Sequence, residues 1–164
     1  MPLYDRRVFT LAAIDPTSAE AQAVLREYYN DIVSRYHGRP ATPAELERVL
    51  TDESSDDLVG EGGTFVVAIV DDRVSGCCGI RYIDADTAEL TRVFVAPTGR
   101  GRGLAQALIG EVEQQAREAG RRVARLDVRS DLVEARSLYA RLGYAEVSAF
   151  NESPYADHWM AKLL

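Results

Sequence analysis

The chain has 164 residues, of which 46% are hydrophobic and 27% charged, as in an ordinary soluble globular protein. Its net charge of −7 and isoelectric point near 4.9 argue against non-specific nucleic-acid binding. The longest apolar run, residues 65–70, is too short to span a bilayer, and no apolar segment of signal-peptide length opens the chain. We therefore expect a cytoplasmic protein with a single domain over residues 1–164 and with no nucleic-acid or membrane partner.

The sequence predicts no metal site. Cys77 and Cys78 are the only cysteines, and neighbouring residues of a strand point to opposite faces, so they are poorly placed to pair with each other. They are expected to be core residues of a protein in a reducing compartment. His37 and His158 lie far apart and form no metal-binding spacing.

The N-terminal third is expected to hold one strand and two helices. Asp15 followed by Pro16 suits a helix N-cap and its first position, and apolar residues at helical spacing follow. Thr42 and Glu45 form a capping box that opens a second helix. The expected elements are a strand over 8–14, helices over 15–37 and 42–50, and a polar loop over 51–63.

Three antiparallel strands are expected next, followed by alternating helices and strands. Asp71 and Asp72 form a hairpin turn, and Asp131 and Gly143 suit the start and the end of a late helix. The expected strands are 64–70, 73–83, 88–95, 123–128, 144–150 and 158–164, and the expected helices are 103–119 and 131–142. The order β-α-α-β-β-β-α-β-α-β-β predicts an α+β domain.

The strand over 88–95 is followed by Pro97 and by the run Gly99-Arg100-Gly101-Arg102-Gly103, and a helix opens at Leu104. Free N–H groups at such a helix start favour an anion. No Lys-Ser or Lys-Thr follows the glycines, which excludes a P-loop, and G-x-G-x-x-G/A fails in both registers. The spacing R-x-x-G-x-A remains, with a solvated basic turn as the alternative.

This loop resembles the coenzyme A pyrophosphate loop of the GCN5-related N-acetyltransferase (GNAT) superfamily. The stretch from Ala135 to Tyr144 is similar to a second signature of that family, A-x-x-L-Y-x-x-x-G-F/Y, and the element order is the GNAT order. The resemblance implies a GNAT fold, with a mixed central sheet of about six to seven strands flanked by about four helices. It also implies acetyl-CoA as acyl donor.

The resemblance assigns the donor site to the glycine loop and to the strand before it. The backbone N–H groups of Arg100, Gly101, Arg102, Gly103, Leu104 and Ala105 would bind the pyrophosphate. The strand end would pair with the pantetheine arm through Val93, Phe94 and Val95. An N–H group of Phe94 or of Val95 would polarise the thioester carbonyl, and the sequence leaves both open. The side chains of Arg100 and Arg102 either bind phosphate or lie in solvent.

The resemblance also implies two catalytic groups. Glu89 would accept the proton of the amine, unless it is engaged in a salt bridge with Arg92 or Arg81. Tyr139 would lie near the coenzyme sulfur and donate a proton to the leaving thiolate, unless it is only a core aromatic. One position departs from the family pattern, since Leu132 stands where many members have an asparagine that contacts the pantetheine.

The acceptor side carries less information. Arg81 and Arg92, on neighbouring strands, are candidates for binding a carboxylate of the acceptor, and Tyr29 and Asn151 are candidates for its walls. Aromatic residues of a helix are usually core, so Tyr28 is expected to be structural. The expected acceptor is a small-molecule amine or a peptide amine, and the expected state is a monomer or homodimer.

The sequence therefore predicts an acetyl-CoA-dependent N-acetyltransferase in which a primary amine attacks directly in a ternary complex. Two alternatives remain. One is the transfer of another acyl group, or transfer to an oxygen acceptor. The other is a non-catalytic acyl-CoA-binding sensor or regulator with the same fold.

Overall fold

The computed structural model describes residues 8–164. The expectation that no signal segment opens the chain rests partly on residues 1–7, which lie outside the described part. The strands are β1 (Thr10–Ala13), β2 (Gly63–Val70), β3 (Arg73–Tyr82), β4 (Thr87–Val95), β5 (Val123–Val128), β6 (Ala145–Glu146) and β7 (His158–Leu163). The helices are α1 (Ala19–His37), α2 (Pro43–Asp52), α3 (Leu104–Glu118) and α4 (Val133–Arg141), with a short 3-10 turn η1 (Pro97–Gly99).

The strands form one mixed sheet in the order β1-β2-β3-β4-β5-β7-β6, with β4 and β5 parallel and the other pairs antiparallel. The prediction of a mixed sheet of about six to seven strands with about four helices is confirmed. Asp71 and Asp72 both adopt positive φ, 49° and 61°, which is the conformation of a tight two-residue hairpin turn between β2 and β3.

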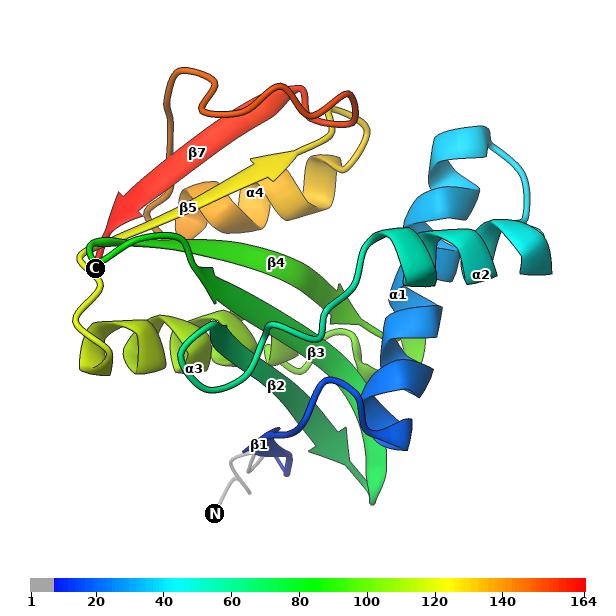
Figure 1. Cartoon of the computed structure of the whole chain (residues 1–164). Coiled ribbons are helices and arrows are strands. Elements are labelled where there is room, and N and C mark those ends of the chain that lie inside the picture. Colours follow the sequence, from blue (N-terminus) through cyan, green and yellow to red (C-terminus); the bar gives the residue numbers. More distant parts are fainter. Residues whose placement is uncertain (1–7) are drawn as a thin grey trace, which may run out of the picture.

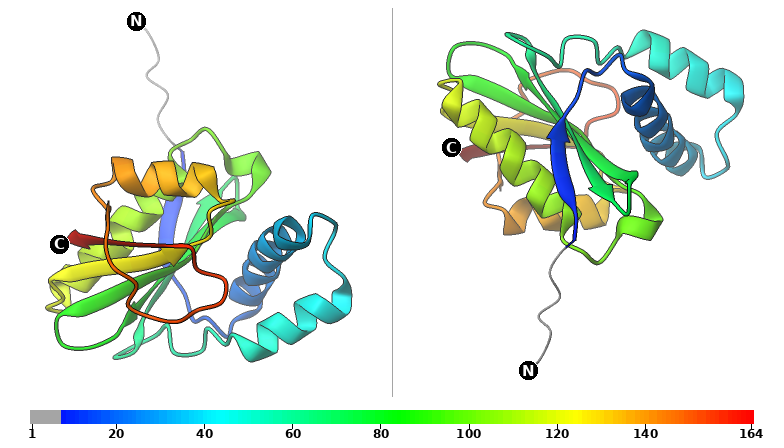
Figure 2. Two further views of the ribbon diagram at one scale, coloured as in Figure 1. Left: turned by 90° about the horizontal axis from the view of Figure 1, so that it is seen from above. Right: turned by 90° about the horizontal axis from the view of Figure 1, so that it is seen from below.

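Helices cover both faces of the sheet (Figure 1, Figure 2). One core lies between the sheet and α3 with α4, and a second lies between the sheet and α1. Cys77 belongs to the core on the α1 side and Cys78 to the core on the α3 side, so the prediction that they point to opposite faces is confirmed. Both thiols are free and buried. No helix among residues 8–164 is long and apolar enough to cross a membrane.

Three local predictions were wrong at element ends. Helix α1 is capped by Ser18, because the Asp15 carboxylate instead accepts hydrogen bonds from Thr17. Asp131 does not cap α4, since both of its carboxylate oxygens bind Arg129. The strand expected over 144–150 contracts to β6 (Ala145–Glu146), and most of residues 147–157 form a loop. The capping box of Thr42 and Glu45 is confirmed.

Candidate functional site

The central feature of the site is the separation of β4 from β5. The two strands pair only at Thr87 with Val123, Ala88 with Ala124 and Glu89 with Arg125, although both continue beyond this point. In Figure 1 they lie together at one end and separate towards α1 and α2. We call the open region beyond Glu89 and Arg125 the split.

A β-bulge in β4 lies at the split. Arg92 and Val93 together lie opposite Cys78, because the register passes from Thr91–Gly79 to Phe94–Cys77. Arg92 adopts φ of 52°, in the left-handed region of backbone conformation that residues other than glycine rarely adopt. Since a bulge bends its strand and increases the local twist, this irregularity turns the end of β4 away from β5.

The backbone at the end of β4 offers a donor to the split. The N–H of Ala96 donates to Ser75 O at 2.8 Å, on the β3 side. Along a strand of an antiparallel pair, successive N–H groups point alternately towards the partner strand and away from it. The N–H of Val95 therefore points away from β3, and that of Phe94 points towards it. Of the two candidates that the sequence leaves open, the geometry therefore favours Val95 as the group that reaches the split.

The glycine loop after β4 forms a cradle of free donors. Gly101 and Gly103 adopt φ of 80° and 75°, and Gly103 is the N-cap of α3. Among the described residues no side chain caps α3 and no acidic residue occupies its first turn, whereas Ser18 caps α1 and Thr42 caps α2. A helix start left free in this way suits a phosphate, so the residues present fit the pyrophosphate of coenzyme A.

A cleft of about 1230 Å³ connects this loop to the opposite side of the sheet through the split. The residues of the glycine loop that line it are Gly99, Arg100, Gly101, Gly103, Leu104 and Ala105, and Arg102 is not among them. Strand β4 also lines the cleft, through Glu89, Val93, Phe94 and Val95. The far wall comes from α1, α2 and the loop between α2 and β2, which carries Glu53 and Ser54.

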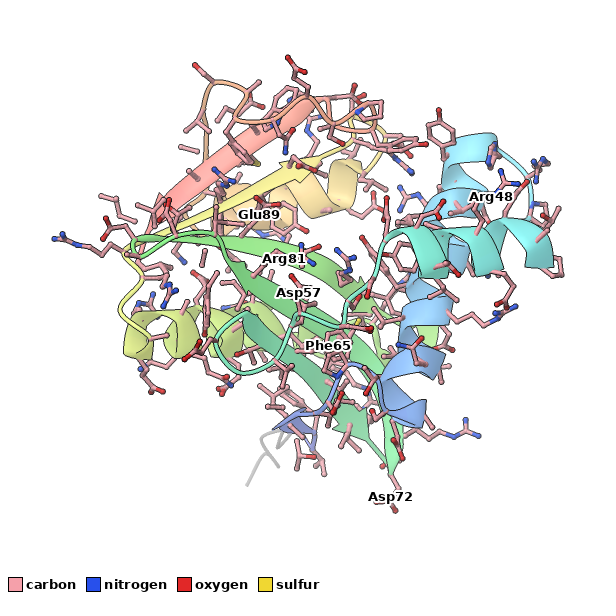
Figure 3. All side chains as sticks on the ribbon, viewed as in Figure 1. Arg48, Asp57, Phe65, Asp72, Arg81 and Glu89 are labelled. Carbon is pink, nitrogen blue, oxygen red and sulfur yellow. The ribbon has the colours of Figure 1, made fainter. Side chains whose placement is uncertain are left out.

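Glu89 is engaged by a partner that the sequence did not suggest. Its Oε2 accepts a hydrogen bond from Arg125 Nε at 3.0 Å, and both side chains are about one-fifth to one-quarter exposed. Arg81, the cross-strand neighbour of Glu89, instead binds Asp57 through two nitrogens at 2.5 and 3.0 Å. Figure 3 shows Asp57, Arg81 and Glu89 on the face of the sheet that the loop after α2 covers.

Two tyrosines approach the split from opposite faces of the sheet. Tyr139, on α4, is 8% exposed, belongs to the core on the α3 side and lines the cleft. Burial raises its pKa above the usual value of a phenol. Tyr28, on α1, also lines the cleft, and burial raises its pKa to about 12. Both groups therefore remain protonated phenols near neutral pH.

Two residues predicted for the acceptor site lie elsewhere. Tyr29 is 1% exposed, packs edge-on against Tyr28 with ring centroids 4.8 Å apart, and does not line the cleft. Asn151 donates to Asp127 Oδ2 at 2.8 Å and accepts from Trp159 Nε1 at 2.9 Å, which fixes the loop over 147–157 to β5 and β7. The amide of Asn151 thus already has protein partners on both of its polar ends.

Leu132, the departure from the family pattern, is the N-cap residue of α4 and lines the cleft. Its apolar side chain packs against the core on the α3 side and offers no hydrogen bond. The end of α1 approaches this region through Arg129, whose Nη1 donates to Ile32 O at 2.9 Å. No group of three potential metal ligands gathers within residues 8–164.

Three features of the site were not predicted from the sequence. They are Arg125 as the partner of Glu89, Tyr28 as a cleft-lining residue, and Glu53 and Ser54 as part of the far wall of the cleft. Arg125 is recognisable only once the parallel register of β4 and β5 is known, because it lies 36 residues from its partner. Tyr28 lies on the same apolar stripe of α1 as core residues, so periodicity alone indicates packing. The acidic loop after α2 gave no motif that would have marked its residues.

Comparison with solved structures supports the fold. The chain is similar to an acyl-CoA N-acyltransferase of Klebsiella pneumoniae, with a TM-score of 0.74, 23% identity, and 96% of this chain and 99% of the other covered. It is also similar to the PaiA N-acetyltransferase of Thermoplasma acidophilum, solved in complex with coenzyme A, with a TM-score of 0.70, 20% identity and coverage of 94% and 99%. These similarities define the class of fold.

The family follows from the sequence itself. The model of the acetyltransferase (GNAT) family matches residues 25–144, and the chain belongs to this family. A curated relative, an uncharacterized N-acetyltransferase of Azospirillum brasilense, is 41% identical over 78 residues, which cover 48% of this chain and 45% of the relative. The chain spans about half or less of the length of the curated relatives it matches.

Proposed function

We propose that the protein transfers the acetyl group of acetyl-CoA to a primary amine, by direct attack of the amine in a ternary complex. The observation that carries this proposal is the single cleft that runs from the cradle at the start of α3, through the split, to the wall formed by α1 and α2. Donor and acceptor can therefore meet at the split from opposite sides, without a covalent enzyme intermediate. Family membership and the coenzyme A bound to the Thermoplasma neighbour support the donor.

The donor is held by backbone rather than by side chains in this proposal. The free N–H groups from Gly101 to Ala105 bind the pyrophosphate, favoured by the positive end of the α3 dipole. Arg100 lines the cleft and adds a charge-assisted bond to a phosphate, whereas Arg102 does not line it. The open edge of β4 at Val93, Phe94 and Val95 holds the pantetheine arm as an added strand would be held.

Acetyl-CoA supplies the thioester, whose carbonyl carbon the amine nitrogen attacks as the carbon–sulfur bond breaks. The N–H of Val95 stabilises the negative charge that develops on the carbonyl oxygen. Glu89 receives the proton that the amine nitrogen loses, through its cleft-facing position beside the split. Tyr139 donates a hydrogen bond to the departing thiolate, and its raised pKa keeps the phenol in the protonated form that can donate.

The acceptor site lies between α1, α2, the loop after α2 and the end of β5. Its cleft-lining carboxylates include Asp31, Asp52 and Glu53, and its cleft-lining cations include Arg48, Arg81 and Arg92. Two of these cations already have partners, because Arg81 binds Asp57 and Arg92 binds the loop after α2. We propose that the acceptor is a small-molecule amine or a peptide amine. We also propose that the protein is a monomer or a homodimer.

The test has a binding arm and a turnover arm. In the binding arm, coenzyme A and acetyl-CoA should each raise the melting temperature of the protein. In the turnover arm, free thiol should be released when acetyl-CoA is combined with one of four probe amines: spermidine, L-lysine, tyramine or a tripeptide with a free N-terminus. A melting curve that millimolar coenzyme A leaves unmoved would contradict the donor assignment.

Two further outcomes decide between the alternatives. Faster thiol release from propionyl-CoA or succinyl-CoA than from acetyl-CoA would replace the acetyl assignment by another acyl group. Binding of coenzyme A without turnover of any probe amine would favour a non-catalytic acyl-CoA sensor. A rate with acetyl-CoA that depends on the added amine supports the proposed transferase.

A further inference from the structure

Arg92 combines two features that seldom occur together in a strand. Its backbone is left-handed, at φ of 52°, a conformation that is strained for a residue with a side chain. Its side chain is almost buried, at 9% exposure, although it carries a charge. A conformation of this kind persists only where the surrounding structure enforces it, and such sites cluster where function requires a fixed geometry.

The guanidinium of Arg92 is bound by the loop between α2 and β2. Nε donates to Ser55 Oγ at 3.1 Å, and Nη2 donates to Glu53 O at 3.1 Å and to Ser54 O at 3.4 Å. Nη1 donates to the neighbouring Thr91 Oγ1 at 2.7 Å. All four acceptors are neutral, and within residues 8–164 no carboxylate forms an ion pair with this guanidinium.

The loop that Arg92 binds is part of the acceptor wall. Glu53 and Ser54 line the cleft, whereas Ser55 is buried at 4% exposure beside them. The carbonyl of Glu53, where α2 ends, also accepts a hydrogen bond from the Tyr29 hydroxyl at 3.5 Å. The fork of one arginine thus binds three consecutive residues of the wall, and the backbone of the same arginine forms the bulge at the split.

We infer that Arg92 is a positioning residue that fixes the acceptor wall to the bulge of β4. It thereby holds the attacking amine at a fixed position and orientation relative to the thioester carbonyl. This inference rests on the proposed function, since it names a residue for the acceptor side of that reaction. It also assigns Arg92 a different role from the binding of an acceptor carboxylate, because four of the five N–H groups of its guanidinium donate to the protein.

Two variants separate the backbone from the side chain. R92G removes the guanidinium and relieves the backbone, because glycine adopts a positive φ without cost. R92K keeps the charge and the strained backbone but has a single ammonium group, which cannot reproduce the arginine fork. The matched control is R73A, which removes an exposed arginine at the start of β3 that does not line the cleft.

The first readout needs no substrate. Hydrogen exchange of the loop amide of Leu58, which donates to Ser55 O at 3.0 Å, should become about tenfold faster or more in both Arg92 variants. The amide of Ala107, which donates to Gly103 O in α3, should exchange at the wild-type rate. Unchanged exchange at Leu58 in R92G and in R92K would overturn the inference.

The second readout uses the probe amine that turns over fastest. In both Arg92 variants the KM for that amine should rise about tenfold or more, because the wall is no longer fixed to the bulge, while the melting shift produced by coenzyme A remains. R73A should leave both quantities at wild-type values. A wild-type KM in R92K would show that the charge alone acts, and would overturn a positioning role.

The two hypotheses fail in different ways. A wild-type protein that acetylates no probe amine contradicts the proposed function, whereas the exchange of Leu58 still reports whether Arg92 holds the loop. An active wild type whose Arg92 variants keep the same amine KM contradicts only the inference. If R92G does not fold, R92K carries both readouts, since it retains the native backbone and a buried cation.

Discussion

Glu89 and Arg125 form the last pair in the register that joins β4 to β5, and a hydrogen bond of 3.0 Å links their side chains at the point where the strands part. Glu89 lines the cleft, whereas Arg125 does not, and the guanidinium of Arg125 lies over the ring of Phe150 at 4.1 Å from the ring centroid. The carboxylate is therefore fixed by one partner while it faces the cleft, where we propose that the amine attacks the thioester and loses its proton.

Replacing Glu89 by glutamine tests its role as a base. E89Q preserves the shape of the side chain and a contact with Arg125 but cannot accept a proton, so we expect kcat with the best probe amine to fall by about a hundredfold or more. The melting shift produced by coenzyme A should stay as in the wild type. If E89Q keeps the wild-type rate from about pH 6 to about pH 9, water rather than Glu89 removes the proton.

Replacing Tyr139 by phenylalanine removes only a hydroxyl. We expect Y139F to lower kcat by about tenfold to a hundredfold. The binding of coenzyme A, measured by a thermal-shift titration, should stay as in the wild type. Because burial raises the pKa of Tyr139, its phenol keeps its proton throughout the alkaline range of an ordinary assay. The wild-type rate should therefore show no decrease from ionisation of Tyr139 below about pH 10. Y139F with an unchanged kcat would make this tyrosine a core residue only.

Gln106 offers a way to separate helix stability from phosphate binding. It lies in the first turn of α3, is exposed and lines the cleft. Q106E places a negative charge at the helix start, which should raise stability by about 0.3–1 kcal/mol in the free protein. The same charge repels a bound pyrophosphate, so coenzyme A should bind about threefold to tenfold more weakly. Tighter or equal binding would argue that the phosphate lies elsewhere.

Alkaline pH should unfold the protein through its buried phenols. Burial raises the pKa values of Tyr29 and Tyr144 well above the usual range of a phenol, whereas an unfolded tyrosine titrates near 10. The folded state therefore holds these protons more tightly, and the stability present below about pH 10 is lost as the pH rises through the folded values. The urea midpoint should fall steeply above about pH 10.

Phenolate absorbance provides the independent check. The check follows the phenols of Tyr29, Tyr139 and Tyr144, which are buried and whose pKa values burial raises. The buried set should ionise only together with unfolding, in one cooperative step that coincides with the loss of helical circular dichroism. A smooth titration of the buried phenols before unfolding would contradict this coupling of ionisation to unfolding.

Local sequence signals predicted the fold well, because each acts over a few residues. The box of Thr42 and Glu45, the turn at Asp71 and Asp72, and the alternation that separates Cys77 from Cys78 all appear in the structure. The errors also have local causes. Asp15 and Asp131 are of a residue type that commonly caps helices. In the structure, however, the carboxylate of Asp15 accepts a hydrogen bond from Thr17, and that of Asp131 accepts one from Arg129.

The amino-acid sequence by itself determined the element order, the glycine cradle at the start of α3 and membership of the GNAT family, because these depend on spacing along the chain. Only the tertiary structure decided which groups meet at the split. The partner of Glu89 is Arg125 rather than Arg81 or Arg92, since the parallel register of β4 and β5 brings residues 36 positions apart together. Arg92 likewise turns to the loop after α2 because the bulge, a property of strand pairing, directs its side chain there.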